Sequence, residues 1–80
     1  MIYIPSGVCS KEIHFELDDN GKIHDAFFVG GCNGNLKGIC SLIEGMDAKE
    51  VIKRLEGICC GPKATSCPDQ LARALKEYVK

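Results

Sequence analysis

Four of the six cysteines in this 80-residue chain lie beside glycine, serine or proline, where loops and the ends of elements are expected. They are Cys9, Cys32, Cys60 and Cys67. Four thiolates can hold a structural zinc ion in a tetrahedral site, and paired thiols can cycle between dithiol and disulfide. The usual Cys-x-x-Cys pairs of zinc sites are absent. The residue types favour a metal site first, but they leave redox-active thiols and simple packing open.

The segment before the last predicted helix gives Cys67 a special position. Proline suits the first position of a helix, so Pro68 predicts that the helix starts there, with Cys67 as the N-cap. Unpaired backbone N–H groups and the helix dipole would then favour the thiolate form of Cys67. Gln70 would complete a capping box. Thr65 and Ser66 are competing cap residues.

The redox alternative uses two of the four cysteines. Cys67 would be the attacking thiolate and Cys60 the resolving thiol of a disulfide-exchange pair. Cys40 lies within a helical apolar stripe and is expected to be a buried, inert thiol. His14 and His24 are nominal metal ligands, but on an exposed strand face we expect both to be solvated.

A glycine-rich turn before the first predicted helix is a second place for chemistry. Gly31, Asn33, Gly34 and Asn35 could bring backbone N–H groups close to the phosphate of a nucleotide. The turn matches neither the Walker A spacing nor the dinucleotide-binding fingerprint. A tight turn with Asn33 or Asn35 as the N-cap is therefore the favoured interpretation.

The elements that must position these groups begin with strands. Residues 2–4 predict an edge strand, and residues 11–18 and 23–29 predict a hairpin. A three-residue loop at 19–21 would place Leu17 opposite Ile23 and Ile13 opposite Phe27. This register makes Glu16 and His24 a cross-strand pair, and it points Asp25 toward the core.

Three helices are predicted after the hairpin, over residues 36–44, 48–56 and 68–79. Gly45 and Gly57 are the expected ends of the first two helices, and Asp47 with Glu50 resembles a capping box for the second. The predicted fold class is α+β, with a small antiparallel sheet of N-terminal strands and hairpin packed against three C-terminal helices.

Length and charge limit the function classes. Residues 1–80 are expected to form a single domain, and a net charge of -1 argues against nucleic-acid binding. The sequence contains neither a signal-peptide pattern nor a membrane-spanning apolar run, so we expect a cytoplasmic protein with no membrane partner. Oligomeric state, including a homo-oligomer, stays open.

Residues 65–69, Thr-Ser-Cys-Pro-Asp, resemble the motif that names the TSCPD-domain family. Residues 7–10, 30–35 and 60–61 resemble its other signatures, and their three cysteines together with Cys67 are the four singled out above. The resemblance implies a small accessory module related to the C-terminal domain of adenosylcobalamin-dependent ribonucleotide reductases. It implies a ribonucleotide reductase or a nucleotide as partner. The chain itself has no room for a catalytic barrel, so whether it is an enzyme stays open.

Overall fold

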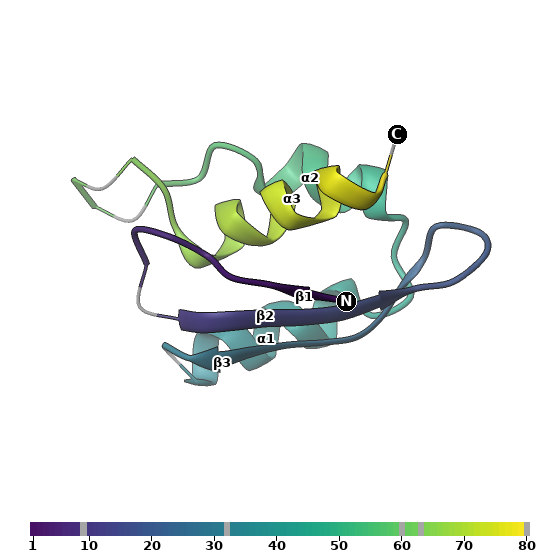
Figure 1. Ribbon diagram of the computed structural model, residues 1–80, viewed down its shortest axis with the longest axis horizontal. Helices are drawn as coiled ribbons and strands as arrows, with labels where there is room; N and C mark the ends of the chain where they lie inside the picture. The colour runs from purple at the N-terminus through teal and green to yellow at the C-terminus, as the bar shows by residue number, and fades with distance from the viewer. Residues whose placement is uncertain (9, 32, 60, 63, 80) are drawn as a thin grey trace.

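The computed structural model describes residues 1–8, 10–31, 33–59, 61–62 and 64–79. Strands β1 (Ile2–Tyr3), β2 (Ser10–Leu17) and β3 (Ile23–Gly30) form one antiparallel sheet in the order β1-β2-β3. Helices α1 (Asn33–Ile43), α2 (Ala48–Leu55) and α3 (Cys67–Tyr78) follow (Figure 1). The predicted α+β class, with β1 at the edge of the sheet, is confirmed.

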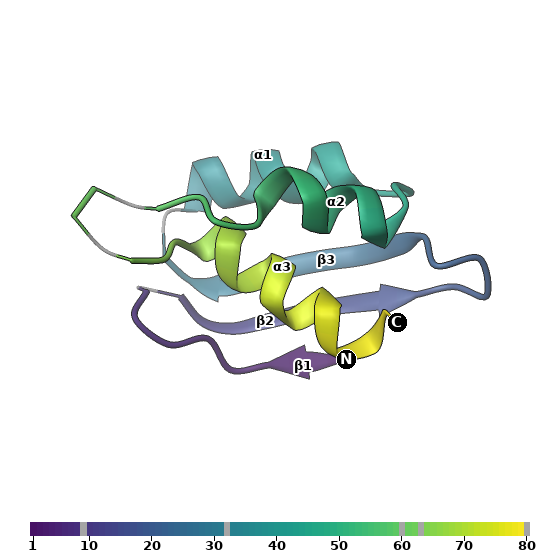
Figure 2. The same ribbon diagram turned by 90° about the horizontal axis from the view of Figure 1, so that it is seen from above.

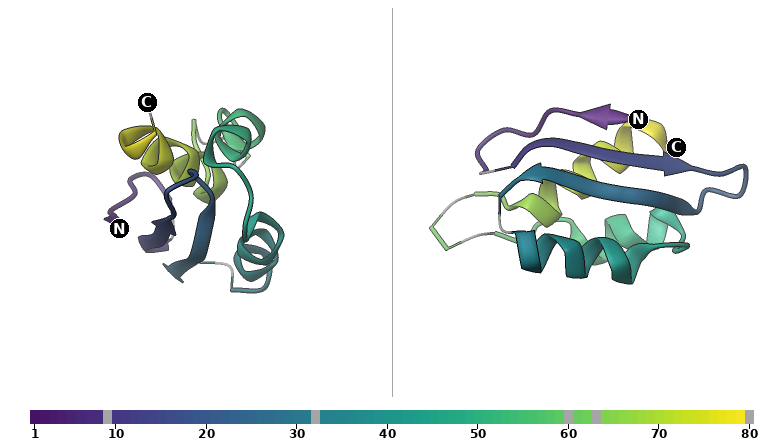
Figure 3. Two further views of the ribbon diagram at one scale, coloured as in Figure 1. Left: turned by 90° about the vertical axis from the view of Figure 1, so that its right-hand side faces the viewer. Right: turned by 90° about the horizontal axis from the view of Figure 1, so that it is seen from below.

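The helices cover one face of the sheet and one of its edges. Helix α3 lies across the sheet, and α1 runs alongside β3 (Figure 2). Helix α2 packs against α3, and the opposite face of the sheet is open (Figure 3). The buried core joins residues from β2, β3 and all three helices or their ends: Ile13, Phe15, Ile23, Ile43, Ala48, Val51, Leu71, Ala74 and Leu75.

The hairpin between β2 and β3 closes with the predicted three-residue loop. Asp18 N–H donates to the carbonyl of Lys22 at 3.0 Å, and Gly21 adopts a left-handed φ of 76°. Leu17 pairs with Ile23, as predicted. A side chain at Gly21 would be strained in this conformation, which is why glycine ends the loop.

The predicted register is wrong beyond the middle of the hairpin. The pairing shifts by one residue on β3 after His24, so Ile13 pairs with Phe28 and not with Phe27. Asp25 occupies this bulge with φ 56° and is exposed. Burying a lone carboxylate is costly, and the extra residue turns Asp25 outward while Phe28 takes the inner face.

Helix α1 begins earlier than predicted. It starts at Asn33, and Asn35 therefore lies inside the helix and is not its cap. Gly30 and Gly31, at the end of β3, have left-handed φ values of 82° and 81°. The periodicity of apolar residues could not reveal this start, because the first turn of α1 carries small polar residues.

Helix α2 matches the predicted start. The Asp47 carboxylate accepts the backbone N–H of Lys49 at 2.9 Å and caps the helix. Glu50 does not complete a capping box in the structure, because its carboxylate pairs with Arg54 at 2.8 Å. Gly57, with φ 85°, follows the end of the helix.

Candidate functional site

Helix α3 starts with a serine cap. Ser66 Oγ accepts the backbone N–H of Asp69 at 3.2 Å, and Cys67 is the first helical residue. The predicted Cys67 cap and the Gln70 capping box are therefore wrong, and the competing Ser66 cap is confirmed. With Ser66 as the cap, Gln70 is the fourth residue of the helix and not the third, which a capping box requires. Its backbone N–H donates to the Ser66 carbonyl at 2.9 Å, as in a regular helix. A hydroxyl oxygen accepts an N–H better than sulfur does, which favours serine at the cap.

The Asp69 carboxylate is the centre of a buried network. Asp69 is 2% exposed and accepts hydrogen bonds from the Gly57 N–H at 2.7 Å, the Arg73 side chain at 3.0 Å and the Thr65 hydroxyl. Burial alone would raise its pKa. The hydrogen bonds from Thr65 and Gly57 and the charge of Arg73 outweigh burial and lower the pKa of Asp69 below its ordinary value.

The segment that follows α2 is fixed to the start of α3 at two points. Gly57 N–H bonds Asp69, and the Ser66 hydroxyl donates to the carbonyl of Ile58 at 2.6 Å. Ser66 thus accepts from its own helix and donates to the neighbouring loop. These two bonds hold the beginning of the loop that leads toward residue 60 against the first turn of α3.

The N-terminal segment is fixed to the same turn through Gln70. The Gln70 side chain is 1% exposed, donates to Thr65 Oγ1 at 2.9 Å and accepts the Ser6 N–H at 3.2 Å. Gly7 follows with φ 74°, and a Cβ added there would lie 3.3 Å from a Thr65 methyl group. Both the backbone angle and the close approach therefore favour glycine at position 7.

The Cys67 sulfur faces the start of β2. Cys67 Sγ lies 3.2 Å from Ser10 Oγ, and the two residues are 9% and 4% exposed. Ser10 in turn pairs with Gly30 at the end of β3. The first turn of α3, the start of β2 and the end of β3 therefore meet at one end of the molecule.

Of the four predicted metal ligands, the structure places Cys67. Cys9, Cys32 and Cys60 lie outside the described residues, so their convergence stays a prediction. Their described neighbours can be followed in Figure 1, where the start of β2, the end of β3 and the 57–66 loop lie toward the same end of the molecule. Within the described chain, no group of three or more His, Cys, Asp or Glu side chains could hold a metal ion.

The two cysteines that were not assigned to the site differ from Cys67. Cys59 is exposed, and its thiol donates to the Gly57 carbonyl at 3.5 Å. Cys40 is half-buried on α1, and burial raises the pKa of its thiol. The raised pKa favours the thiol form of Cys40.

The predicted nucleotide-binding turn lies where β3 passes into α1. Gly31, Gly34 and Asn35 are exposed at this point. Asn33 is the first residue of α1, so Gly34 and Asn35 belong to the first helical turn. The structure places these residues together but leaves their binding of a phosphate untested.

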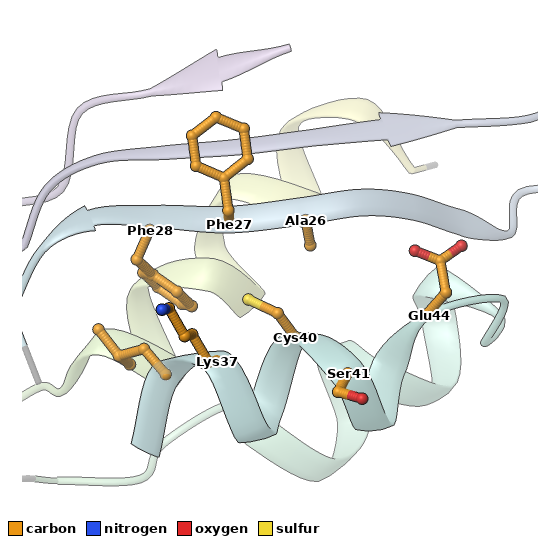
Figure 4. A pocket seen from close by; sticks show the side chains of 8 residues that line it. Ala26, Phe27, Phe28, Lys37, Cys40, Ser41 and Glu44 are labelled. Carbon is orange, nitrogen blue, oxygen red and sulfur yellow. The ribbon is translucent and has the colours of Figure 1, made fainter. Parts of the chain in front are cut away.

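A groove runs between β3 and α1, close to that turn. It has a volume of about 540 Å³ and is lined by Ala26, Phe27, Phe28, Leu36, Lys37, Cys40, Ser41 and Glu44. Figure 4 shows the Cys40 sulfur pointing toward β3, while the Phe27 ring points away toward the other side of the sheet. The apolar stripe had predicted that Cys40 is buried in the core. This prediction is wrong, because Cys40 is half-buried and lines the groove.

His24 links the hairpin to the end of α1. Its Nε2 lies 2.8 Å from Asp18 and its Nδ1 lies 2.8 Å from Glu44, so both ring nitrogens face carboxylates. The hydrogen bonds to Asp18 and then to Glu44 raise the pKa of His24, and the same contacts lower the pKa of both carboxyls. Only the imidazolium can donate to both partners. His14 instead bonds Glu12 at 2.7 Å and stacks on Phe27.

We expect His24 to make the stability of the protein depend on pH. Because its pKa is raised in the folded state, its contribution is complete below the ordinary histidine value of 6.5 and is lost as the pH rises through the folded pKa. Thermal unfolding of wild type and His24→Gln between acidic and alkaline pH should show a difference that shrinks as pH rises. A constant difference across that range would contradict the assignment, and His14→Gln is the control.

Sequence reasoning missed Asp69 as the hub and Ser10 as the partner of Cys67. The pattern Ser66-x-x-Asp69 before an apolar helix is a capping signal, and it could have identified both the cap and the acid. No local pattern could have paired Ser10 with Cys67, because 57 positions separate them in the chain.

Comparison with known proteins gives one family match, which covers nearly the whole chain. A family model described as TSCPD domain matches residues 1–79 of the 80-residue chain. The searches of curated proteins and of solved structures gave no match. No helix among the described residues is long and apolar enough to cross a membrane.

Proposed function

Because the chain belongs to the TSCPD-domain family, we propose that it is a small binding or accessory module whose Cys9, Cys32, Cys60 and Cys67 hold one zinc ion. The ion would sit where α3 begins and would fix the loops that carry the cysteines. Structural zinc sites are tetrahedral and contribute directly to the free energy of folding. A domain of this size benefits from such a staple.

The observation that carries this proposal is the buried contact between Ser10 and Cys67 at 3.2 Å. Ser10 follows Cys9 directly in the sequence, and its strand partner Gly30 lies two residues before Cys32. Ile58, which bonds Ser66, lies two residues before Cys60. A described neighbour of each of the three other cysteines is therefore held near the first turn of α3.

The donor set fits zinc in its chemistry. Thiolate sulfur is a preferred zinc ligand, and the described member of the set, Cys67, is buried beside a hydroxyl group that can orient it. The bonds from Asp69 and Ser66 fix the loop that leads to Cys60. When bound, zinc would supply cross-linking of these segments, while the residues of this chain bind and orient it.

The exposure of Cys67 supports the metal site over the thiol-disulfide alternative. A cysteine that attacks external disulfides must be accessible, and reactive cysteines sit in partly exposed positions. Cys67 is 9% exposed, and the start of β2 covers its sulfur. Exchange between Cys67 and Cys60 would require this contact to open.

The resemblance to the C-terminal domain of adenosylcobalamin-dependent ribonucleotide reductases makes such a reductase the first protein partner to test. The turn at residues 31–35 is the first surface to test for nucleotide binding. Its exposed Gly31, Gly34 and Asn35 support access to a ligand. Any reductase chemistry would come from the partner.

Metal analysis of freshly purified, reduced protein tests the zinc site. We expect about one zinc ion per chain in wild type, and loss of the ion in Cys67→Ser, because a structural site needs all four ligands. Cys59→Ser is the matched control, since Cys59 is exposed and lies outside the predicted set. It should keep the ion.

Three outcomes would oppose this function. Metal-free wild type with a reversible Cys60–Cys67 disulfide would support the redox alternative. Metal-free protein whose melting temperature is unchanged when all four cysteines are replaced by serine would show that they only pack. Equal zinc in wild type and Cys67→Ser would exclude Cys67 as a ligand.

A further inference from the structure

We propose that Ser10 is a positioning residue of this site, whose hydroxyl donates a hydrogen bond to the Cys67 sulfur and so strengthens zinc binding. The inference rests on the proposed zinc site and goes beyond it, because it assigns a role to a residue that cannot itself be one of the four thiolate ligands. The hydrogen bond from which it is argued joins two residues that the structure describes.

The geometry of the pair is that of a buried hydrogen bond. Ser10 Oγ and Cys67 Sγ are 3.2 Å apart, and the two residues are 4% and 9% exposed. In the thiol form of Cys67, either atom could be the donor. A sulfur bound to zinc has lost its proton, so only the Ser10 hydroxyl can then donate. Zinc binding therefore fixes the direction of this bond.

A hydrogen bond to a charged acceptor is stronger than one between neutral groups, and it is stronger still where water is excluded. The Ser10–Cys67 bond should therefore stabilise the zinc-bound sulfur more than the free thiol. In metal sites, removal of such an outer hydrogen bond typically lowers metal affinity by about 10–100-fold. Within the described chain, Ser10 provides the one hydrogen bond recorded to this sulfur.

The fold holds the hydroxyl in place before any metal binds. Ser10 is the first residue of β2, and its backbone pairs with Gly30 of β3. The strand register shifts between Ser10 and Glu12, directly after this residue. Ser10 is thus anchored by the sheet, while Cys67 is anchored by the capped start of α3.

The sharpest test compares Ser10→Thr with Ser10→Val. These side chains have nearly the same shape and both suit a strand, but only threonine keeps the hydroxyl. Zinc affinity would be measured by competition with a chromogenic chelator. We expect Ser10→Val and Ser10→Ala to bind zinc about 10–100-fold more weakly than wild type, and Ser10→Thr to restore most of the affinity. Ser6→Ala, an exposed serine in the preceding segment, is the control.

A second measurement separates positioning from general destabilisation. Cadmium in place of zinc gives an NMR signal that depends on the sulfur ligands, and it should shift in Ser10→Val but stay near wild type in Ser10→Thr. Equal affinities for the threonine and valine variants would overturn the role of Ser10 while leaving the zinc site intact. Wild type without bound zinc would instead overturn the proposed function, and with it this inference.

Discussion

Asp69→Ala should be among the most destabilising single substitutions in this protein, with a loss of about 2–4 kcal/mol in the free energy of unfolding, because hydrogen-bond donors lose their acceptor. The substitution removes a carboxylate that is 2% exposed and accepts from Gly57, Thr65 and Arg73. It leaves the buried Thr65 hydroxyl and the part-buried Gly57 N–H without this acceptor. Urea unfolding of wild type and variant measures the loss.

A matched control lies in the neighbouring helix. Asp69–Arg73 and Glu50–Arg54 are both ion pairs of the i,i+4 type, but Glu50 is 43% exposed. Removal of an exposed pair by Glu50→Ala should cost only about 0.3–0.5 kcal/mol. If Asp69→Ala costs no more than Glu50→Ala, the buried network does not hold the start of α3.

The stabilisation that the Asp69 carboxylate provides should depend on pH in the acidic range. The pKa of Asp69 is lowered by its hydrogen bonds and by Arg73 despite burial, so its contribution is present above the ordinary value of 3.8 and is lost as the pH falls through the folded pKa. The difference in stability between wild type and Asp69→Asn should therefore shrink at strongly acidic pH. A difference that grows on acidification would have the wrong sign.

Phe15→Ala should be comparably severe, at about 3–5 kcal/mol, because it opens a cavity in the core. Phe15 is 1% exposed at the centre of the sheet, and its ring meets Tyr78 of α3 edge-on at a centroid distance of 5.6 Å. Removal of the ring would therefore weaken the packing of the helices on the sheet. Chemical denaturation with a fluorescence or circular dichroism readout measures the change.

Phe27 is the control for this substitution. It lies on the adjacent strand, is 50% exposed on the open face of the sheet, and stacks on His14 at 4.4 Å. Phe27→Ala should cost less than about 1.5 kcal/mol, because an exposed stacked pair loses little buried area. Equal losses for the two phenylalanines would contradict the assignment of the inner and outer faces of the sheet.

The structure gives each residue of the Thr-Ser-Cys-Pro-Asp segment a physical role. Thr65 and Asp69 form the buried network, Ser66 caps α3 and bonds the neighbouring loop, Cys67 meets Ser10, and Pro68 suits the first turn of the helix. The motif therefore fastens three segments to one helix start. This arrangement explains why its residue types occur together without requiring each of them to be a ligand.

The amino-acid sequence by itself determined the elements and the family of this protein. Alternation identified the hairpin, Gly21 fixed its loop, Asp47 marked the start of α2, and the apolar stripe of α3 marked its buried side. These features follow from local periodicity and turn chemistry, which act between residues close together in the chain. The Thr-Ser-Cys-Pro-Asp segment likewise identified the TSCPD family that the chain matches.

The tertiary structure decided the details that depend on distant contacts. The bulge at Asp25 turns outward a carboxylate that would otherwise face the core. Ser66 caps α3 by accepting the Asp69 N–H, and only the packed structure shows that its hydroxyl also donates to Ile58 beyond α2. Ser10 meets Cys67 only because the sheet and α3 pack together. Burial and hydrogen-bond satisfaction act on the whole fold, so local patterns could not fix these contacts.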